Sequence, residues 1–114
     1  MKILCICNHG NVRSACLARE IKDVNVGYPP NLFKYESVAI GAHNNSFNTI
    51  KIFCDWADKV IDLSDNIDIV QNNLKLLAGN KYERFDIGND RWGNPFASDL
   101  RLLCQNKIKE WDFK

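Results

Sequence analysis

Four short apolar segments alternate along this chain with four stretches of helical periodicity. The apolar segments are typical of buried strands and span residues 2–7, 35–40, 59–63 and 82–87. Apolar side chains recur at helical spacing after each segment, over residues 12–24, 47–56, 65–78 and 95–108. Because strands separated by helices pair in parallel, the alternation predicts a three-layer α/β/α fold with a four-stranded parallel sheet.

The ends of the predicted helices carry capping signals. Asn44-Asn45-Ser46 offers N-caps for the second helix, Ser64 or Asp65 for the third, and Asn94-Pro95 suits the cap and first residue of the last. On the first helix, Glu20 is expected on the outer face. Since no linker or repeat interrupts the pattern, we expect one domain over residues 1–114.

Composition restricts the function classes. A formal net charge of +1 gives no electrostatic reason to expect nucleic acid or a membrane surface as partner. No apolar run approaches about 18 residues and no signal-peptide pattern opens the chain, so the expected setting is cytoplasmic. The chain has five cysteines, which are Cys5, Cys7, Cys16, Cys54 and Cys104. Their odd number indicates reduced thiols. No two of them form a C-x-x-C pair, so no zinc site is expected.

The segment after the first strand combines a thiol with an anion-binding pattern. Cys7 is followed six residues later by Arg13 and then by Ser14. A strand, a turn and a helix in this order surround one thiol with backbone N–H groups, a helix N-terminus and a guanidinium, which together bind a tetrahedral oxyanion. We therefore predict a loop that binds phosphate or sulfate. Its residues are Asn8, His9, Gly10, Asn11, Val12 and Arg13.

The residue types in this loop suit phosphoryl chemistry. A thiolate at Cys7 would be stabilised by the N–H donors and the nearby cation, which makes it a nucleophile. Arg13 has a planar fork that binds two oxygens at once and stays charged. Gly10 permits a positive φ that turns backbone N–H groups inward.

Residues 7–14 resemble the phosphate loop of the low-molecular-weight protein tyrosine phosphatase family. The resemblance covers essentially the whole chain and is to a short branch from bacteria and phages. It continues in Ile40-Gly41-Ala42, in Trp56-Ala57-Asp58-Lys59-Val60-Ile61 and in residues 90–96. It implies a cysteine-dependent phosphomonoesterase, without cofactor or metal, that acts through a phosphocysteine on a phosphorylated protein or an aryl phosphate. Ser14 would then donate its hydroxyl to the Cys7 sulfur, or alternatively cap the helix.

The chain departs from the family inside the loop. The family usually has an Asn three residues after the nucleophile, where its side chain braces the loop. This chain has Gly10 there and Asn11 one place later. His9 is expected at the rim of the site rather than as a base for Cys7.

A second departure affects the general acid. The family uses the Asp of an Asp-Pro-aromatic run, and the matching run here is Asn94-Pro95-Phe96, whose amide cannot supply a proton. Asp90 in the same loop is the best candidate acid, followed by Asp86. Trp92 either lines the cleft and stacks on a substrate ring or packs its own loop.

Two other functions stay open. A non-catalytic binder of phosphorylated partners is favoured by Asn94. An arsenate reductase would share the loop but needs further cysteines, and Cys54 and Cys104 fall on predicted helices without an evident paired thiol. A phosphocysteine carrier fits less well, because it has no evident need for Arg13.

Overall fold

The computed structural model describes residues 1–32, 34–65, 67–88 and 91–111. The strands are β1 (Lys2–Cys7), β2 (Glu36–Gly41), β3 (Lys59–Asp62) and β4 (Tyr82–Arg84). The α-helices are α1 (Arg13–Asp23), α2 (Phe47–Trp56), α3 (Asp68–Ala78) and α4 (Ser98–Trp111). Short 3₁₀ turns occupy η1 (Pro30–Leu32) and η2 (Gly79–Lys81). The four strands form a parallel sheet in the order β2-β1-β3-β4, which confirms the predicted α/β class.

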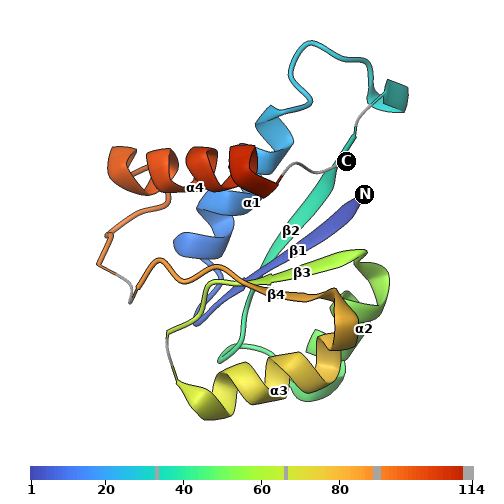
Figure 1. The fold of residues 1–114 in the computed structure, drawn as a ribbon, viewed down its shortest axis with the longest axis vertical. Coiled ribbons are helices and arrows are strands. Elements are labelled where there is room, and N and C mark those ends of the chain that lie inside the picture. Colours follow the sequence, from blue (N-terminus) through green and yellow to red (C-terminus); the bar gives the residue numbers. More distant parts are fainter. Residues whose placement is uncertain (33, 66, 89–90, 112–114) are drawn as a thin grey trace.

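Helices cover both faces of the sheet. Figure 1 shows α1 and α4 on one side and α2 and α3 on the other, as a three-layer arrangement requires. β1 separates two apolar clusters, because Cys5 and Cys7 belong to the cluster on the α1 side whereas Leu4 and Ile6 belong to the cluster on the α2 side. A strand that is buried on both faces is apolar, which explains why β1 is apolar after the exposed Lys2 at its start.

Two helix starts differ from the prediction. α3 begins at Asp68 with Ile67 as N-cap, because the side chains of Ser64 and Asp65 bind other partners. α4 begins at Ser98 rather than at Pro95. The Asn94 side chain accepts a hydrogen bond from the backbone N–H of Phe96 at 2.7 Å, so it closes a short turn before the helix.

Other local predictions have mixed outcomes. Ser46 is the N-cap of α2 and accepts a hydrogen bond from the N–H of Thr49, as predicted. β4 ends at Arg84, three residues before the predicted end. The placement of Glu20 on an outer face is wrong: its side chain is buried and binds Arg101 of α4. A helix that packs against both the sheet and a second helix buries a wider arc of its surface than one apolar stripe.

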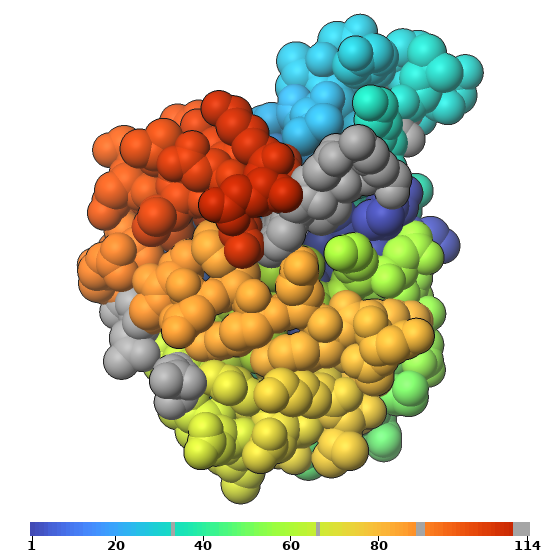
Figure 2. All heavy atoms as spheres, viewed as in Figure 1, coloured from blue at the N-terminus to red at the C-terminus, as the bar shows by residue number. Residues whose placement is uncertain are grey.

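The segment between α1 and β2 stands out from the body of the molecule in Figure 2, where it is cyan. It carries exposed apolar side chains, among them Val26 and Leu32. None of the helices in the described part of the chain is both long and apolar enough to cross a bilayer. The two apolar clusters lie between the sheet and its four helices. The polar residues of the loops that leave the carboxyl ends of the strands are not part of these clusters.

Candidate active site

The loop after β1 lies where ligands bind in parallel sheets. β1 is an inner strand, with β2 on one side and β3 on the other, so the chain order reverses next to it. Ligands of such sheets bind at this switch point, beyond the carboxyl ends of the strands. Residues 8–12 connect the end of β1 to the start of α1 at that position.

Cys7 is buried and its sulfur meets two polar groups. The backbone N–H of Gly10 donates a hydrogen bond to Sγ at 3.2 Å, and the Ser14 hydroxyl lies 3.1 Å from Sγ. Ser14 lies inside α1, whose N-cap is Val12, so the alternative capping role of Ser14 is wrong. The predicted contact between Ser14 and Cys7 is present.

The turn after β2 holds the loop in place. Three successive donors of this turn, the backbone N–H groups of Ala42 and His43 and the side-chain amide of Asn44, bind the carbonyl oxygens of residues 7, 8 and 9 in the same order. The donor to acceptor distances are 2.8, 2.9 and 2.8 Å. The β1–β2 ladder is thus extended past the end of both strands, and it fixes the first half of the loop.

Two glycines allow this close approach. Gly10 has φ +79°, and a Cβ there would lie 2.5 Å from the backbone nitrogen of Gly41. A Cβ on Gly41 would lie 2.5 Å from the carbonyl carbon of His9. Real Cβ atoms do not approach backbone this closely, so both positions require glycine. The glycine three residues after Cys7 therefore has a structural reason in this chain, because a side chain there would overlap the backbone of the turn after β2.

Arg13 is buried and largely held by the protein itself. Its Nη1 donates to Asp65 Oδ1 at 2.7 Å and to the carbonyl oxygen of Gly88 at 3.1 Å, and its Nη2 donates to Asn8 Oδ1 at 2.9 Å. A guanidinium has five N–H groups, so some donors remain after these bonds. One of them, Nε, is buried and has no hydrogen-bond partner among the described residues. A buried unpaired donor is costly, and an oxyanion in the loop would satisfy it.

Asn8 connects three segments through one side chain. Its Oδ1 accepts from Arg13 and from the backbone N–H of Asp65, and its Nδ2 donates to His43 Nε2 at 2.8 Å. Sequence reasoning gave Asn8 only a place in the loop and missed Asp65 and His43. These two residues follow β3 and β2 at the same edge of the sheet where Cys7 ends β1, so the rule that located the Cys7 loop would also have indicated them.

The remaining loop residues divide between rim and core. His9 is exposed, as predicted, and its Nδ1 lies 3.4 Å from Asn44 Oδ1. Asn11 is exposed, whereas Val12 packs into the apolar cluster that contains Cys7. No hydrogen bond among the described residues uses the backbone N–H of Asn11 or Val12. These donors stand next to the N-terminus of α1, where an anion is favoured.

Trp92 packs against α4 and is nearly buried, with 7% of its surface exposed. Its indole Nε1 donates to Asp99 Oδ2 at 2.8 Å, and this hydrogen bond lowers the pKa of Asp99. The Arg91 guanidinium stacks 3.9 Å from the centroid of the Trp92 ring. These contacts favour packing within its own segment over a place in the wall of the cleft.

The expected acid, Asp90, lies outside the described residues. Asp86 has a largely exposed side chain whose Oδ1 accepts from the N–H of Gly88 and lies 3.6 Å from Arg84 Nη2. The second candidate carboxylate therefore belongs to a surface turn just past β4.

The cysteines are all reduced and buried. A hydrogen bond from Cys104 to Cys16 lowers the pKa of Cys16 and raises the pKa of Cys104. This pair corrects the expectation that Cys104 has no thiol neighbour. Both side chains are completely buried between α1 and α4. Within the described parts of the chain, no three His, Cys, Asp or Glu side chains are grouped so as to hold a metal ion.

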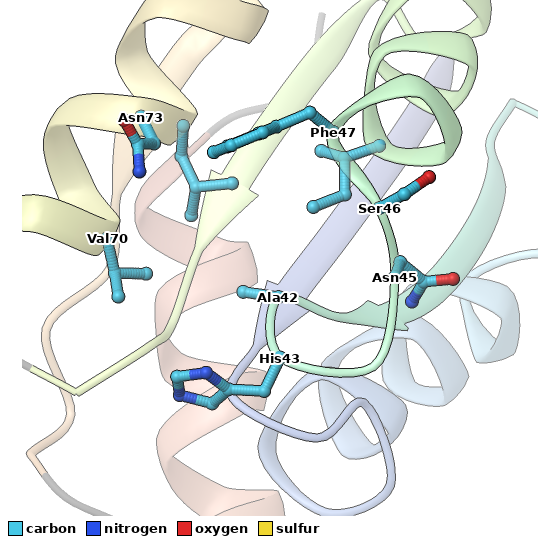
Figure 3. Close-up of a pocket in the computed structure, with 9 residues that line it drawn as sticks. Ala42, His43, Asn45, Ser46, Phe47, Val70 and Asn73 are labelled. Atoms are coloured by element: carbon cyan, nitrogen blue, oxygen red, sulfur yellow. The ribbon is translucent and has the colours of Figure 1, made fainter.

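A pocket of about 330 Å³ lies between α2 and α3, beside the turn that braces the loop. Figure 3 shows His43 and Ala42 at one end of it, with Phe47 and Val70 on opposite walls. Because Ala42 and His43 also bind the carbonyl oxygens of residues 7 and 8, the pocket and the loop share a wall.

Comparison with protein-family models, with curated proteins and with solved structures finds no match for this chain.

Proposed function

We propose that this chain is a cysteine-dependent phosphomonoesterase related to the low-molecular-weight protein tyrosine phosphatases. One observation carries the proposal. Arg13 is a buried cation fixed by Asp65 and Asn8, and its unpaired Nε belongs to the loop that also holds the Cys7 thiol. A buried arginine with an unmatched donor fits a loop that takes up an oxyanion.

The proposed reaction begins with attack of the Cys7 thiolate on phosphorus. A sulfur to phosphorus bond forms while the bond to the leaving oxygen breaks, and Arg13 with the loop N–H groups holds the equatorial oxygens. Water then hydrolyses the phosphocysteine and releases phosphate. The backbone N–H of Gly10 donates to Sγ, and the Ser14 hydroxyl, 3.1 Å from Sγ, is placed to donate to a thiolate that attacks or leaves.

The leaving oxygen needs a proton, which we assign to Asp90. General acid catalysis contributes about 10²- to 10⁴-fold in rate, and most when the leaving group is a strong base. The Asn94 amide cannot act in this way, and it is bound to the N–H of Phe96.

The direct test is a time course of aryl phosphate hydrolysis with the wild type and Cys7→Ser. The variant should lose turnover and still bind inorganic phosphate, because Arg13 and the loop are intact. Cys54→Ser is the matched control, since it removes an equally buried thiol on the α2 side of the sheet and should keep full activity. Hydrolysis at the wild-type rate in Cys7→Ser would refute the scheme.

The role of Asp90 is tested separately with two leaving groups. Asp90→Asn should slow hydrolysis of phenyl phosphate by about 10²-fold or more and affect p-nitrophenyl phosphate less, because nitrophenolate needs little protonation. Asp86→Asn serves as the control and should leave the ratio of the two rates unchanged. An equal loss on both substrates in Asp90→Asn would exclude proton donation.

A binding module for phosphorylated partners is the second candidate, favoured by the Asn94 substitution. Phosphate binding by the wild type without any turnover would select it. An arsenate reductase would need an accessible resolving thiol, whereas Cys16 and Cys104 are completely buried. Absence of thiol-dependent arsenate reduction would remove this third candidate.

A further inference from the structure

We propose that neutral His43 is a positioning residue, which orients the Asn8 amide and through it Arg13, so that protonation of His43 weakens anion binding in the loop. His43 lies outside the loop, and the consequence for anion binding rests on the proposed role of Arg13. It follows from three hydrogen bonds that meet at one amide.

The orientation of the Asn8 amide is determined by its partners. Two donors, Arg13 Nη2 and the backbone N–H of Asp65, both point at Oδ1, at 2.9 and 2.8 Å. A flipped amide would set its NH₂ group against both of them. Nδ2 must therefore face His43 as a donor, at 2.8 Å from Nε2.

This geometry specifies the state of the histidine. An Nε2 atom that accepts a hydrogen bond carries no proton, so the proton of neutral His43 is on Nδ1. Protonation of Nε2 would bring an N–H group against the NH₂ group of Asn8. Asn8 cannot turn over to relieve this conflict without losing its bonds to Arg13 and Asp65, so one side of the network must open.

The surroundings of His43 allow such a change. The ring is exposed and lines the pocket of Figure 3, where the other lining side chains carry no charge. His9 approaches from the loop side with its ring centroid 5.6 Å away, and Arg13 lies beyond Asn8. The backbone N–H of His43 binds the Asn8 carbonyl oxygen and does not titrate, so a change in the side chain leaves the turn in place.

The tautomer can be measured independently of any activity. In ¹⁵N NMR spectra of the wild type at about pH 8, above the range in which imidazoles gain a second proton, His43 should show an unprotonated Nε2 and a protonated Nδ1. Asn8→Ala should remove the preference for this tautomer. A protonated Nε2 in the neutral wild type would overturn the proposal, whether or not the protein is a phosphatase.

The consequence for binding is measured with sulfate, whose charge is constant between about pH 5 and 8, where imidazoles titrate. His43→Gln retains a side-chain acceptor that does not titrate, whereas His43→Ala has none. At about pH 8, His43→Gln should bind sulfate like the wild type and His43→Ala about three- to tenfold more weakly, the value of one hydrogen bond. Toward about pH 5 the wild type should weaken relative to His43→Gln by a similar factor.

Titrating groups other than His43 are common to the two proteins and cancel in their ratio. His9→Gln removes the other imidazole near the site and should keep the acid-dependent loss seen in the wild type. A wild-type to His43→Gln ratio that is constant with pH would overturn the proposal. If the wild type binds no sulfate at any pH, the proposed function and the binding consequence both fail, and the NMR result alone decides the orientation of His43.

Discussion

The two sides of the Cys7 loop are built differently. On the side of β2 and β3, residues 42–44 and Asp65 hold the loop and Arg13 through backbone and side-chain hydrogen bonds. On the side of the segment between β4 and α4, the Gly88 carbonyl oxygen accepts from Arg13, whereas the side chains of Trp92 and Asn94 bind partners within that segment and α4. The proposed anion binding therefore rests mainly on the first side and the proposed proton donation on the second, and the two sides meet at Arg13.

The largest expected effect on the braced side is that of Gly10→Ala. The new methyl group would lie 2.5 Å from the Gly41 nitrogen, at a residue with φ +79°. Strain and overpacking together should lower the free energy of unfolding by about 3 kcal/mol and weaken sulfate binding. Gly27→Ala is the control, because Gly27 has φ +92° and no atom within 4 Å of the added Cβ. Equal losses of stability in the two variants, measured by urea unfolding, would show that the loop and the turn are not tightly packed.

Asp65→Ala should have the next largest effect. It leaves the buried Arg13 cation without its ion-pair partner, which we expect to cost about 2 kcal/mol of unfolding free energy, allowing for the partial exposure of Asp65. Sulfate should restore more stability to this variant than to the wild type, because the anion would take over part of the charge balance. Asp86→Ala, at an exposed ion pair past β4, should change little. Equal stabilisation of all three proteins by sulfate would argue against an anion next to Arg13.

Glu20 connects the two sides of the loop. It lies on α1, and its carboxylate accepts hydrogen bonds from Arg101 and Gln105 of α4, the helix that follows the segment after β4. Burial alone would raise its pKa, but hydrogen bonds from Gln105 and Arg101 and the charges of Arg101 and Arg19 bring the pKa below its usual value. A carboxylate with a lowered folded-state pKa stabilises above its unfolded pKa of about 4.3, and this stability is lost as pH falls through the folded value.

Glu20→Gln should therefore lower the free energy of unfolding by about 1 kcal/mol at neutral pH and by progressively less below about pH 4. Urea unfolding curves at several pH values measure the difference. Asp23→Asn, at an exposed residue of the same helix, is the control for the loss of one acidic charge. A constant difference between the wild type and Glu20→Gln down to about pH 3 would contradict the lowered pKa.

The sequence could predict those features that depend on residues close to one another along the chain. β1 and α1 were predictable because their apolar periodicity is a local property, and so was the Ser46 cap, which binds a residue three positions away. Arg13 and Asp65 are 52 positions apart, and their pairing depends on β1 and β3 being neighbours in the sheet. The pattern of alternation predicts parallel strands but not their order, so it could not show which side chains meet at the edge.

The predicted start of the third helix was wrong because its capping candidates have a second possible role. Ser64 and Asp65 suit helix capping by composition, but the buried carboxylate of Asp62 takes the Ser64 hydroxyl and Arg13 takes the Asp65 carboxylate. Charged partners bind more strongly than a helix N–H, so α3 begins later with an apolar N-cap. Local propensity cannot reveal such competition, because the stronger partner comes from a distant segment.

The smallest expected effect concerns the side that would supply the acid. Asn94→Asp restores the Asp-Pro-aromatic run, and an aspartate can accept the same hydrogen bond from the N–H of Phe96, so stability should change by less than about 0.5 kcal/mol. If Asp90 is the acid, the variant should hydrolyse phenyl phosphate within about twofold of the wild-type rate, because the new carboxylate lies in a turn that already has its partner. The double variant Asp90→Asn, Asn94→Asp should then be as slow as Asp90→Asn alone. A rate increase of about tenfold or more in either background would contradict this and assign the proton donor to position 94. The turn that contains position 94 would then have to reach the leaving oxygen at the Cys7 site.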